Sequence, residues 1–100
     1  MAAKKSDAMK LLEKVAGGPL TFATMLRSIR EAEDMSLAEF AARLSVSRSH
    51  LCDIEQGRKV VSVERAALWA DLLGQSKKQF VRLALQSEVD RAGLNYKVAL

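Results

Sequence analysis

The residues best suited to chemistry in this 100-residue chain lie in one short stretch, SVSRSHLCDIEQGRK, from Ser45 to Lys59. It contains the only histidine and the only cysteine, His50 and Cys52, and Asp53 follows the cysteine directly. These residue types can form an activated thiol, and they can also bind a metal ion. The third alternative is a surface that recognises another molecule.

The spacing of these residues argues against a catalytic cluster or a metal site. Leu51 and Ile54 are one helical turn apart, which predicts a helix. Residues two apart on a helix point about 200° away from each other, so His50 cannot activate Cys52. A structural zinc ion needs about four ligands, for which one thiol and one imidazole do not suffice. We therefore expect no enzyme, no metal and no cofactor.

The composition fits one small helical domain. Hydrophobic residues make up 49% of the chain and charged residues 28%, and leucine and alanine dominate the apolar set, which favours helices. No apolar run approaches the roughly 18 to 20 residues that span a bilayer, and charge interrupts the N-terminal segment too often for a secretory leader. A single cysteine agrees with a reducing compartment. We expect a cytoplasmic protein with no membrane partner.

The charge of the chain is modest, so its distribution matters more than its size. The net charge is +4, and basic residues are enriched between Arg43 and Arg65. A basic middle segment suits a polyanion partner, although many solvated surfaces have the same composition. Charge alone therefore leaves the partner open.

Capping residues and glycines predict five helices within residues 20–93. Ser36 and Glu39 form a Ser-x-x-Glu capping box, and a similar Ser-x-x-Gln box opens at Ser76. The apolar stripe that includes Trp69 and Leu72 predicts a central helix. The predicted helices run from about Phe22 to Asp34, Ser36 to Ser45, Ser47 to Gly57, Ser62 to Gly74 and Ser76 to near Gly93. The turn between the second and third is too short for them to lie side by side.

The two ends of the chain differ from this helical middle. Residues 1–19 carry a short amphipathic pattern that ends at Gly17-Gly18-Pro19, which predicts an N-terminal arm or helix. In residues 94–100 apolar and polar residues alternate, which predicts a short β-strand. Its apolar positions are Leu94, Tyr96, Val98 and Leu100. A lone strand needs a partner strand for its backbone groups, and a second copy of the chain is the simplest source of one. The alternatives are a disordered tail and a tail that folds back on its own core.

The segment from Met35 to Lys59 resembles the helix-turn-helix of the XRE/Cro-type, or phage-repressor-like, family of bacterial DNA-binding proteins. The motifs that carry the resemblance are Leu37-x-x-Phe40-Ala41-x-x-Leu44, Val46-Ser47-Arg48 and Leu51-x-x-Ile54-Glu55-x-Gly57-Arg58. It extends from Arg27 to about Gly74. The resemblance implies an all-α, five-helix repressor-like domain that binds double-stranded DNA at the bacterial nucleoid.

The resemblance also implies a role for each site residue. The base-contacting positions are Arg48, Ser49 and Asp53, and the phosphate-contacting positions are Ser47, Gln56, Arg58, Lys59 and Arg43. Arg48 can bond guanine O6 and N7, and Asp53 can accept from cytosine N4. For Asp53 the alternative is a pair with His50, or simple repulsion of phosphate. Glu55 is implied to form a structural ion pair with Arg30.

Two positions depart from the family pattern. Leu37 stands where many members have a glutamine that binds phosphate, which removes one contact. Ser45 stands where the turn usually has glycine, so either Ser45 adopts an unfavourable, left-handed backbone or the turn shifts slightly, at a cost of about 1 kcal/mol.

These observations favour a sequence-specific transcriptional regulator, in the first place a repressor, that acts as a homodimer on an inverted repeat. The rival is the antitoxin of a type II toxin-antitoxin pair, which binds a toxin protein and also represses its own operon. A third interpretation is a scaffold that binds no nucleic acid.

Overall fold

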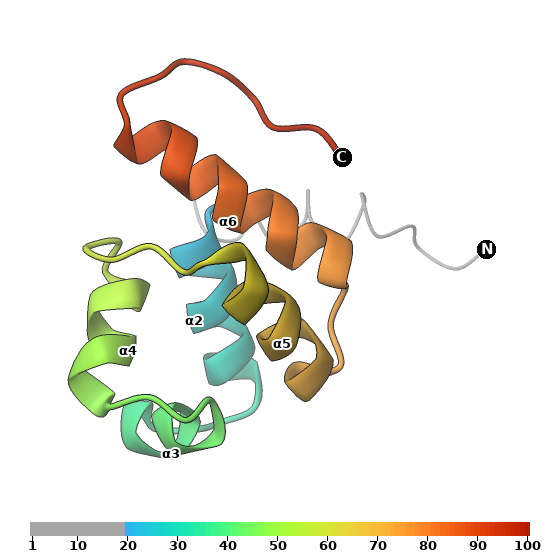
Figure 1. Ribbon diagram of the computed structural model, residues 1–100. Helices are drawn as coiled ribbons and strands as arrows, with labels where there is room; N and C mark the ends of the chain where they lie inside the picture. Colours follow the sequence, from blue (N-terminus) through green and yellow to red (C-terminus); the bar gives the residue numbers. More distant parts are fainter. Residues whose placement is uncertain (1–19) are drawn as a thin grey trace.

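The computed structural model describes residues 20–100, and this part of the chain contains five α-helices (Figure 1). They are α2 (Phe22–Ala32), α3 (Leu37–Arg43), α4 (Arg48–Glu55), α5 (Val63–Leu73) and α6 (Lys77–Arg91). The all-α prediction is confirmed for this range, and the helix bounds agree with those predicted within about two residues. The predicted amphipathic helix of residues 1–19 lies outside the described residues.

Each of these five helices begins at a hydroxyl residue that caps it. The side chains of Thr21, Ser36, Ser47, Ser62 and Ser76 each accept a hydrogen bond from the backbone N–H three residues later. At Ser36 the box is reciprocal, because its N–H donates to Glu39 Oε1 at 2.9 Å. The second predicted box is only half formed, since Gln79 Oε1 accepts instead from Arg82. The caps satisfy N–H groups that have no partner within the helix.

The same five helices end in one way, with a residue in the left-handed region. The residue after that one donates its N–H to the carbonyl five positions back, as Val46 does to Ala41 at 3.0 Å. The left-handed residues are Asp34, Ser45, Gly57, Gly74 and Gly93. Glycine adopts this conformation freely, whereas Ser45, at φ 59°, bears the predicted strain.

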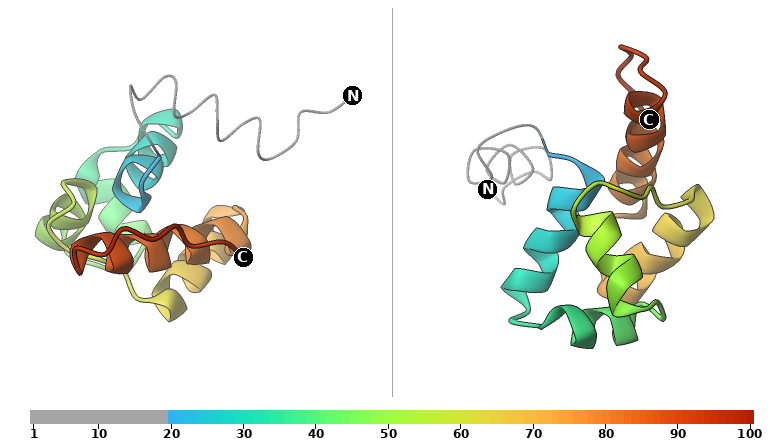
Figure 2. Two further views of the ribbon diagram at one scale, coloured as in Figure 1. Left: turned by 90° about the horizontal axis from the view of Figure 1, so that it is seen from above. Right: turned by 90° about the vertical axis from the view of Figure 1, so that its left-hand side faces the viewer.

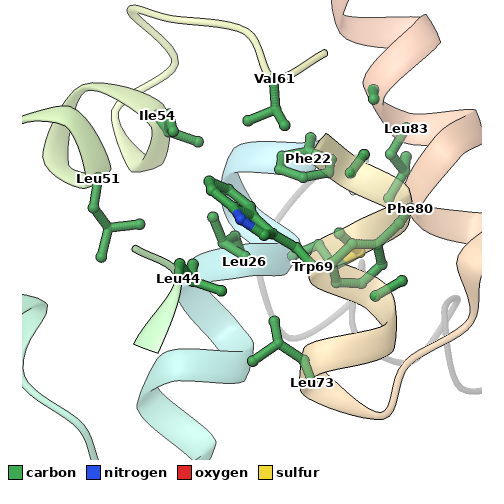
Figure 3. Packing of buried hydrophobic residues seen from close by; sticks show 14 of the residues in the cluster. Phe22, Leu26, Leu44, Leu51, Ile54, Val61, Trp69, Leu73, Phe80 and Leu83 are labelled. Carbon is green, nitrogen blue, oxygen red and sulfur yellow. The ribbon is translucent and has the colours of Figure 1, made fainter. Parts of the chain in front are cut away.

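The core is one cluster of buried side chains to which all five of these helices contribute, with α5 packed most closely against α6. Trp69 of α5 is 1% exposed, and its indole points toward Leu26 of α2 and Ile54 of α4 (Figure 3). The rings of Phe22 and Phe80 meet edge to face with centroids 5.6 Å apart, which joins α2 to α6. The prediction that the helix of Trp69 is central therefore holds for this residue.

Leu72 is a correction to the predicted stripe. The apolar pattern of α5 included it, but its side chain is 47% exposed, and Leu68 one turn earlier is 59% exposed. The periodicity of a helix marks an apolar stripe without showing how much of that stripe its neighbours cover. One side of α5 therefore remains apolar and open within residues 20–100.

The C-terminal tail is a second correction, because residues 94–100 form no strand in the single chain. The tail turns at Gly93 and runs back along α6 (Figures 1 and 2). Gln86 of α6 binds it: Nε2 donates to the Tyr96 carbonyl at 2.8 Å, and Oε1 accepts from the Val98 N–H at 2.8 Å. A residue of a neighbouring parallel strand would bond the same two groups, so one side-chain amide replaces the ladder that the chain alone lacks.

Candidate nucleic-acid interface

The candidate site is built on α3, the turn after it, and α4. Leu44 closes α3 against the core at 2% exposure, and Val46 in the turn is half-buried. From α4, Leu51 and Ile54 are buried at 0% and 1% exposure. These anchors fix the rotation of α4 about its axis, so its opposite side faces solvent.

The outer side of α4 carries the residues predicted to contact bases. Arg48 and Ser49 occupy the first turn of the helix and are exposed. Neither side chain forms a hydrogen bond or an ion pair with another residue of the described range. Arg48 is therefore available to a ligand without breaking a contact, at the helix end where side chains reach base edges.

Asp53 has partners that the sequence interpretation missed. Its Oδ1 accepts from Arg58 Nε at 2.9 Å, and its Oδ2 lies 3.6 Å from Lys59 Nζ. The hydrogen bond from Arg58 lowers the pKa of Asp53 below its usual range and raises the pKa of Arg58. The suggested pair with His50 is not among its contacts, so that alternative is wrong. The i to i+5 spacing across Gly57, which reverses the chain, was the available signal.

The structure therefore brings a predicted base-contacting residue and two predicted phosphate-contacting residues into one cluster. We call Asp53, Arg58 and Lys59 the basic-loop cluster. The cations remain exposed, at 59% and 53% of their side chains, and the carboxylate at 29%. The Arg58 guanidinium also approaches Cys52 Sγ at 3.8 Å.

The remaining predicted phosphate contacts lie at the two ends of α4 and at the end of α3. Ser47 is the N-cap of α4, and its Oγ accepts from the His50 N–H at 3.0 Å. Gln56 is exposed at the other end of the helix. Arg43 ends α3 and lies apart from this group, with one guanidinium N–H donating to the Leu72 carbonyl at 3.5 Å.

Arg30 and Glu55 form the structural ion pair that the resemblance implied. Arg30 Nε donates to Glu55 Oε2 at 2.9 Å, and Nη2 donates to Oε1 at 3.1 Å. These hydrogen bonds raise the pKa of Arg30. Both side chains are mostly buried, at 16% and 3% exposure, so the pair joins α2 to the end of α4.

No part of this surface is arranged for metal chemistry. Within residues 20–100, no three His, Cys, Asp or Glu side chains lie close enough to share an ion. Cys52 is half-buried and free. What the site offers is a capped, anchored helix with exposed hydrogen-bonding groups and cations at its two ends.

Comparison with known proteins now identifies the family. A family model described as a helix-turn-helix domain matches residues 21–83, which is more than half of the chain. The chain belongs to the helix-turn-helix domain family. The family match is consistent with the XRE/Cro-type resemblance and covers all of α2, α3, α4 and α5 and the first part of α6. No curated protein and no solved structure matches the chain.

Membership of the helix-turn-helix family makes this a DNA-binding domain, of a kind that is typically not enzymatic. In its geometry α3 is the first helix of the motif and α4 is the recognition helix, which in such domains enters the major groove. In the part of the chain that the structure covers, none of the helices is long and apolar enough to cross a bilayer.

Proposed function

We propose that this protein is a sequence-specific transcriptional regulator, acting as a repressor, whose recognition helix α4 reads base edges in the major groove. The observation that carries the proposal is the state of Arg48. It is exposed in the first turn of a helix whose other side is fixed by Leu51 and Ile54, and it has no partner among residues 20–100. An unpaired arginine at this position can donate hydrogen bonds to guanine O6 and N7 at the same time.

The surrounding residues divide into base and phosphate contacts. Ser49 and Asp53 stand with Arg48 on the outer side of α4 as base contacts. The proposed phosphate contacts are Ser47, Gln56, Arg58, Lys59 and Arg43. Phosphate contacts hold the register of the protein on the duplex, and base contacts supply the sequence information.

We further propose that two copies bind an inverted repeat, because one module of this size makes few contacts for tight specific binding. The tail supports this. Leu94, Tyr96 and Leu100 are 50%, 70% and 55% exposed, and Gln86 bonds only the edge of the tail that carries the Tyr96 carbonyl and the Val98 N–H. Within residues 20–100 the backbone groups of Asn95 and Lys97 form no hydrogen bond, which leaves them available to pair with a second tail.

An antiparallel pair centred on Tyr96 would place Asn95 opposite Lys97 of the second copy and the two tyrosines opposite each other. This register brings aromatic side chains together and keeps the lysines apart. Deleting residues 94–100 and measuring mass in solution tests it. A loss of dimer is expected, and an undiminished dimer would remove the tail from the interface.

The central experiment is a binding selection on random duplex DNA, followed by affinity measurements at two salt concentrations. Arg48→Ala should relax the preference at one base pair by about 1 to 3 kcal/mol. Arg58→Ala should weaken binding and reduce the salt dependence without relaxing the preference at any single base pair. Lys78→Ala removes the same charge from the start of α6 and should change neither. Absence of binding to any duplex at low salt would leave the scaffold interpretation.

A second candidate function is supported by α5. Leu68 and Leu72 are exposed and four residues apart, so they share one face of the helix. An open apolar face of this kind suits a protein partner, as the antitoxin of a type II pair would need for its toxin. Co-purification of a small protein encoded beside the gene, lost on Leu68→Ser, would favour the antitoxin. A protein that purifies alone and represses would favour the regulator.

A further inference from the structure

Four hydrogen-bonding and ionic contacts converge on Asp53. Its backbone carbonyl accepts from the Arg58 and Lys59 N–H groups at 2.8 and 3.3 Å. Its carboxylate accepts from Arg58 Nε at 2.9 Å and faces Lys59 Nζ at 3.6 Å. Gly57, at φ 76°, turns the chain back so that these contacts can form. Asp53 therefore holds both the backbone and the side chains of the loop that follows the recognition helix.

The Asp53 carboxylate contacts Arg58 and Lys59 through the same groups that would bind a phosphate. An arginine binds phosphate oxygens through its N–H groups, and a lysine binds them as a point charge, and these are the groups that face Asp53. With Asp53 ionised, the basic-loop cluster carries a net charge of +1 instead of +2. A DNA phosphate that approaches Arg58 and Lys59 must compete with the Asp53 carboxylate for Arg58 Nε and Lys59 Nζ.

We propose that Asp53 is a specificity-determining residue that acts as an intramolecular competitor for DNA phosphate, masking Arg58 and Lys59 in the free protein. This inference rests on the proposed phosphate role of those two residues. Non-specific duplex is bound through its phosphates, so binding it exchanges one anion for another with little net gain. A specific site also offers a cytosine N4 amino group to the released carboxylate. Asp53 therefore weakens non-specific binding more than specific binding.

The test replaces the carboxylate by its uncharged isostere, Asp53→Asn, and measures binding to a random-sequence duplex and to the selected operator over a range of salt. The matched control is Asp71→Asn, which removes the same charge from another exposed ion pair, that of Asp71 with Lys77 at 3.1 Å. Asp53→Asn should bind the random duplex about tenfold more tightly at low salt, with a salt slope steeper by about 0.9 for each unmasked cation. Asp71→Asn should change it by less than about twofold.

Specificity gives a second measurement. The ratio of operator to random-duplex affinity should fall about tenfold or more for Asp53→Asn, since the operator contact is lost as random binding rises. Adding Arg58→Ala to Asp53→Asn should cancel most of the gain on random duplex, because the unmasked cation is gone. Asp53→Ser should behave as Asp53→Asn does, and circular dichroism of each variant shows whether α4 remains folded.

Two results would overturn the competitor role while leaving the proposed function intact. One is an equal gain for Asp53→Asn and Asp71→Asn, which would show an effect of net charge alone. The other is weaker random-duplex binding by Asp53→Asn, which would mean that Asp53 orients Arg58 toward phosphate. If the unmodified protein binds no duplex at low salt, the proposed function fails and the inference fails with it.

Discussion

Arg30 of α2 and Glu55 of α4 meet through two hydrogen bonds, at 2.9 and 3.1 Å, across 25 residues of sequence. The remaining guanidinium nitrogen of Arg30, Nη1, donates to the Met35 carbonyl at 3.0 Å, in the loop between α2 and α3. One side chain thus joins α2, the start of the helix-turn-helix and the end of the recognition helix. The pair fixes the position of α4 without taking part in the surface that faces solvent.

Glu55→Ala should lower the free energy of unfolding by about 3 kcal/mol, because it leaves the largely buried Arg30 guanidinium without its partner. Urea unfolding monitored by circular dichroism measures it. The control is Glu31→Ala, which breaks the exposed Arg27–Glu31 pair at 3.6 Å and should cost less than about 0.5 kcal/mol. Equal losses for the two variants would show that burial of the pair does not matter.

Ser45→Gly should stabilise the protein by about 0.5 to 1 kcal/mol, since glycine removes the strain of a left-handed backbone and costs part of that gain in chain entropy. Urea unfolding again measures the change. Ala42→Gly, in the helical part of α3, is the matched control and should destabilise by about 1 kcal/mol. If both glycine variants destabilise alike, the turn at Ser45 is not strained.

The capping box of α3 should make stability depend on pH in the acid range. The hydrogen bond from the Ser36 backbone N–H is the largest cause that lowers the pKa of Glu39, and the Ser36 hydroxyl lowers it further. A lowered pKa means stabilisation that is present above the ordinary glutamate value of about 4.3 and is lost as the pH falls through the folded value. Carbon-13 NMR titration of the carboxyl groups should find Glu39 below that ordinary value, and Ser36→Ala should raise it. An unchanged midpoint in Ser36→Ala would show that the serine hydroxyl does not lower the pKa of Glu39.

Gln86→Ala should release the tail from α6. The Val98 N–H donates to Gln86 Oε1, so its exchange with solvent deuterium is slow while this bond holds. Loss of a bond of about 1 kcal/mol should speed exchange by roughly fivefold to tenfold. Gln56→Ala, an exposed glutamine at the end of α4, should leave Val98 exchange unchanged. Exchange that stays slow in Gln86→Ala would show that another contact protects the tail.

Most of the helical boundaries could be predicted from the sequence, because each depends on local chemistry. A serine hydroxyl caps the N–H three residues later, and a glycine adopts the left-handed backbone conformation at the end of a helix. Both hold whatever packs around them. Ser36, Ser47 and Gly57 were predicted for these reasons, and the structure confirms them. The second box at Ser76 was half wrong because Arg82 competes for the Gln79 side chain.

The sequence by itself determined the order of the helices and the apolar side of α4, since these follow from spacing within one or two turns. Its motifs also carried the resemblance to a helix-turn-helix family. Only the tertiary structure decided that Asp53 bonds Arg58 rather than His50, that Leu72 faces solvent, and that the tail of the single chain binds Gln86 of its own α6. The physical reason is that each of these outcomes is a competition between partners. The partner that forms the contact is the one that the folded chain brings within about 3 Å, and helical periodicity does not predict that distance.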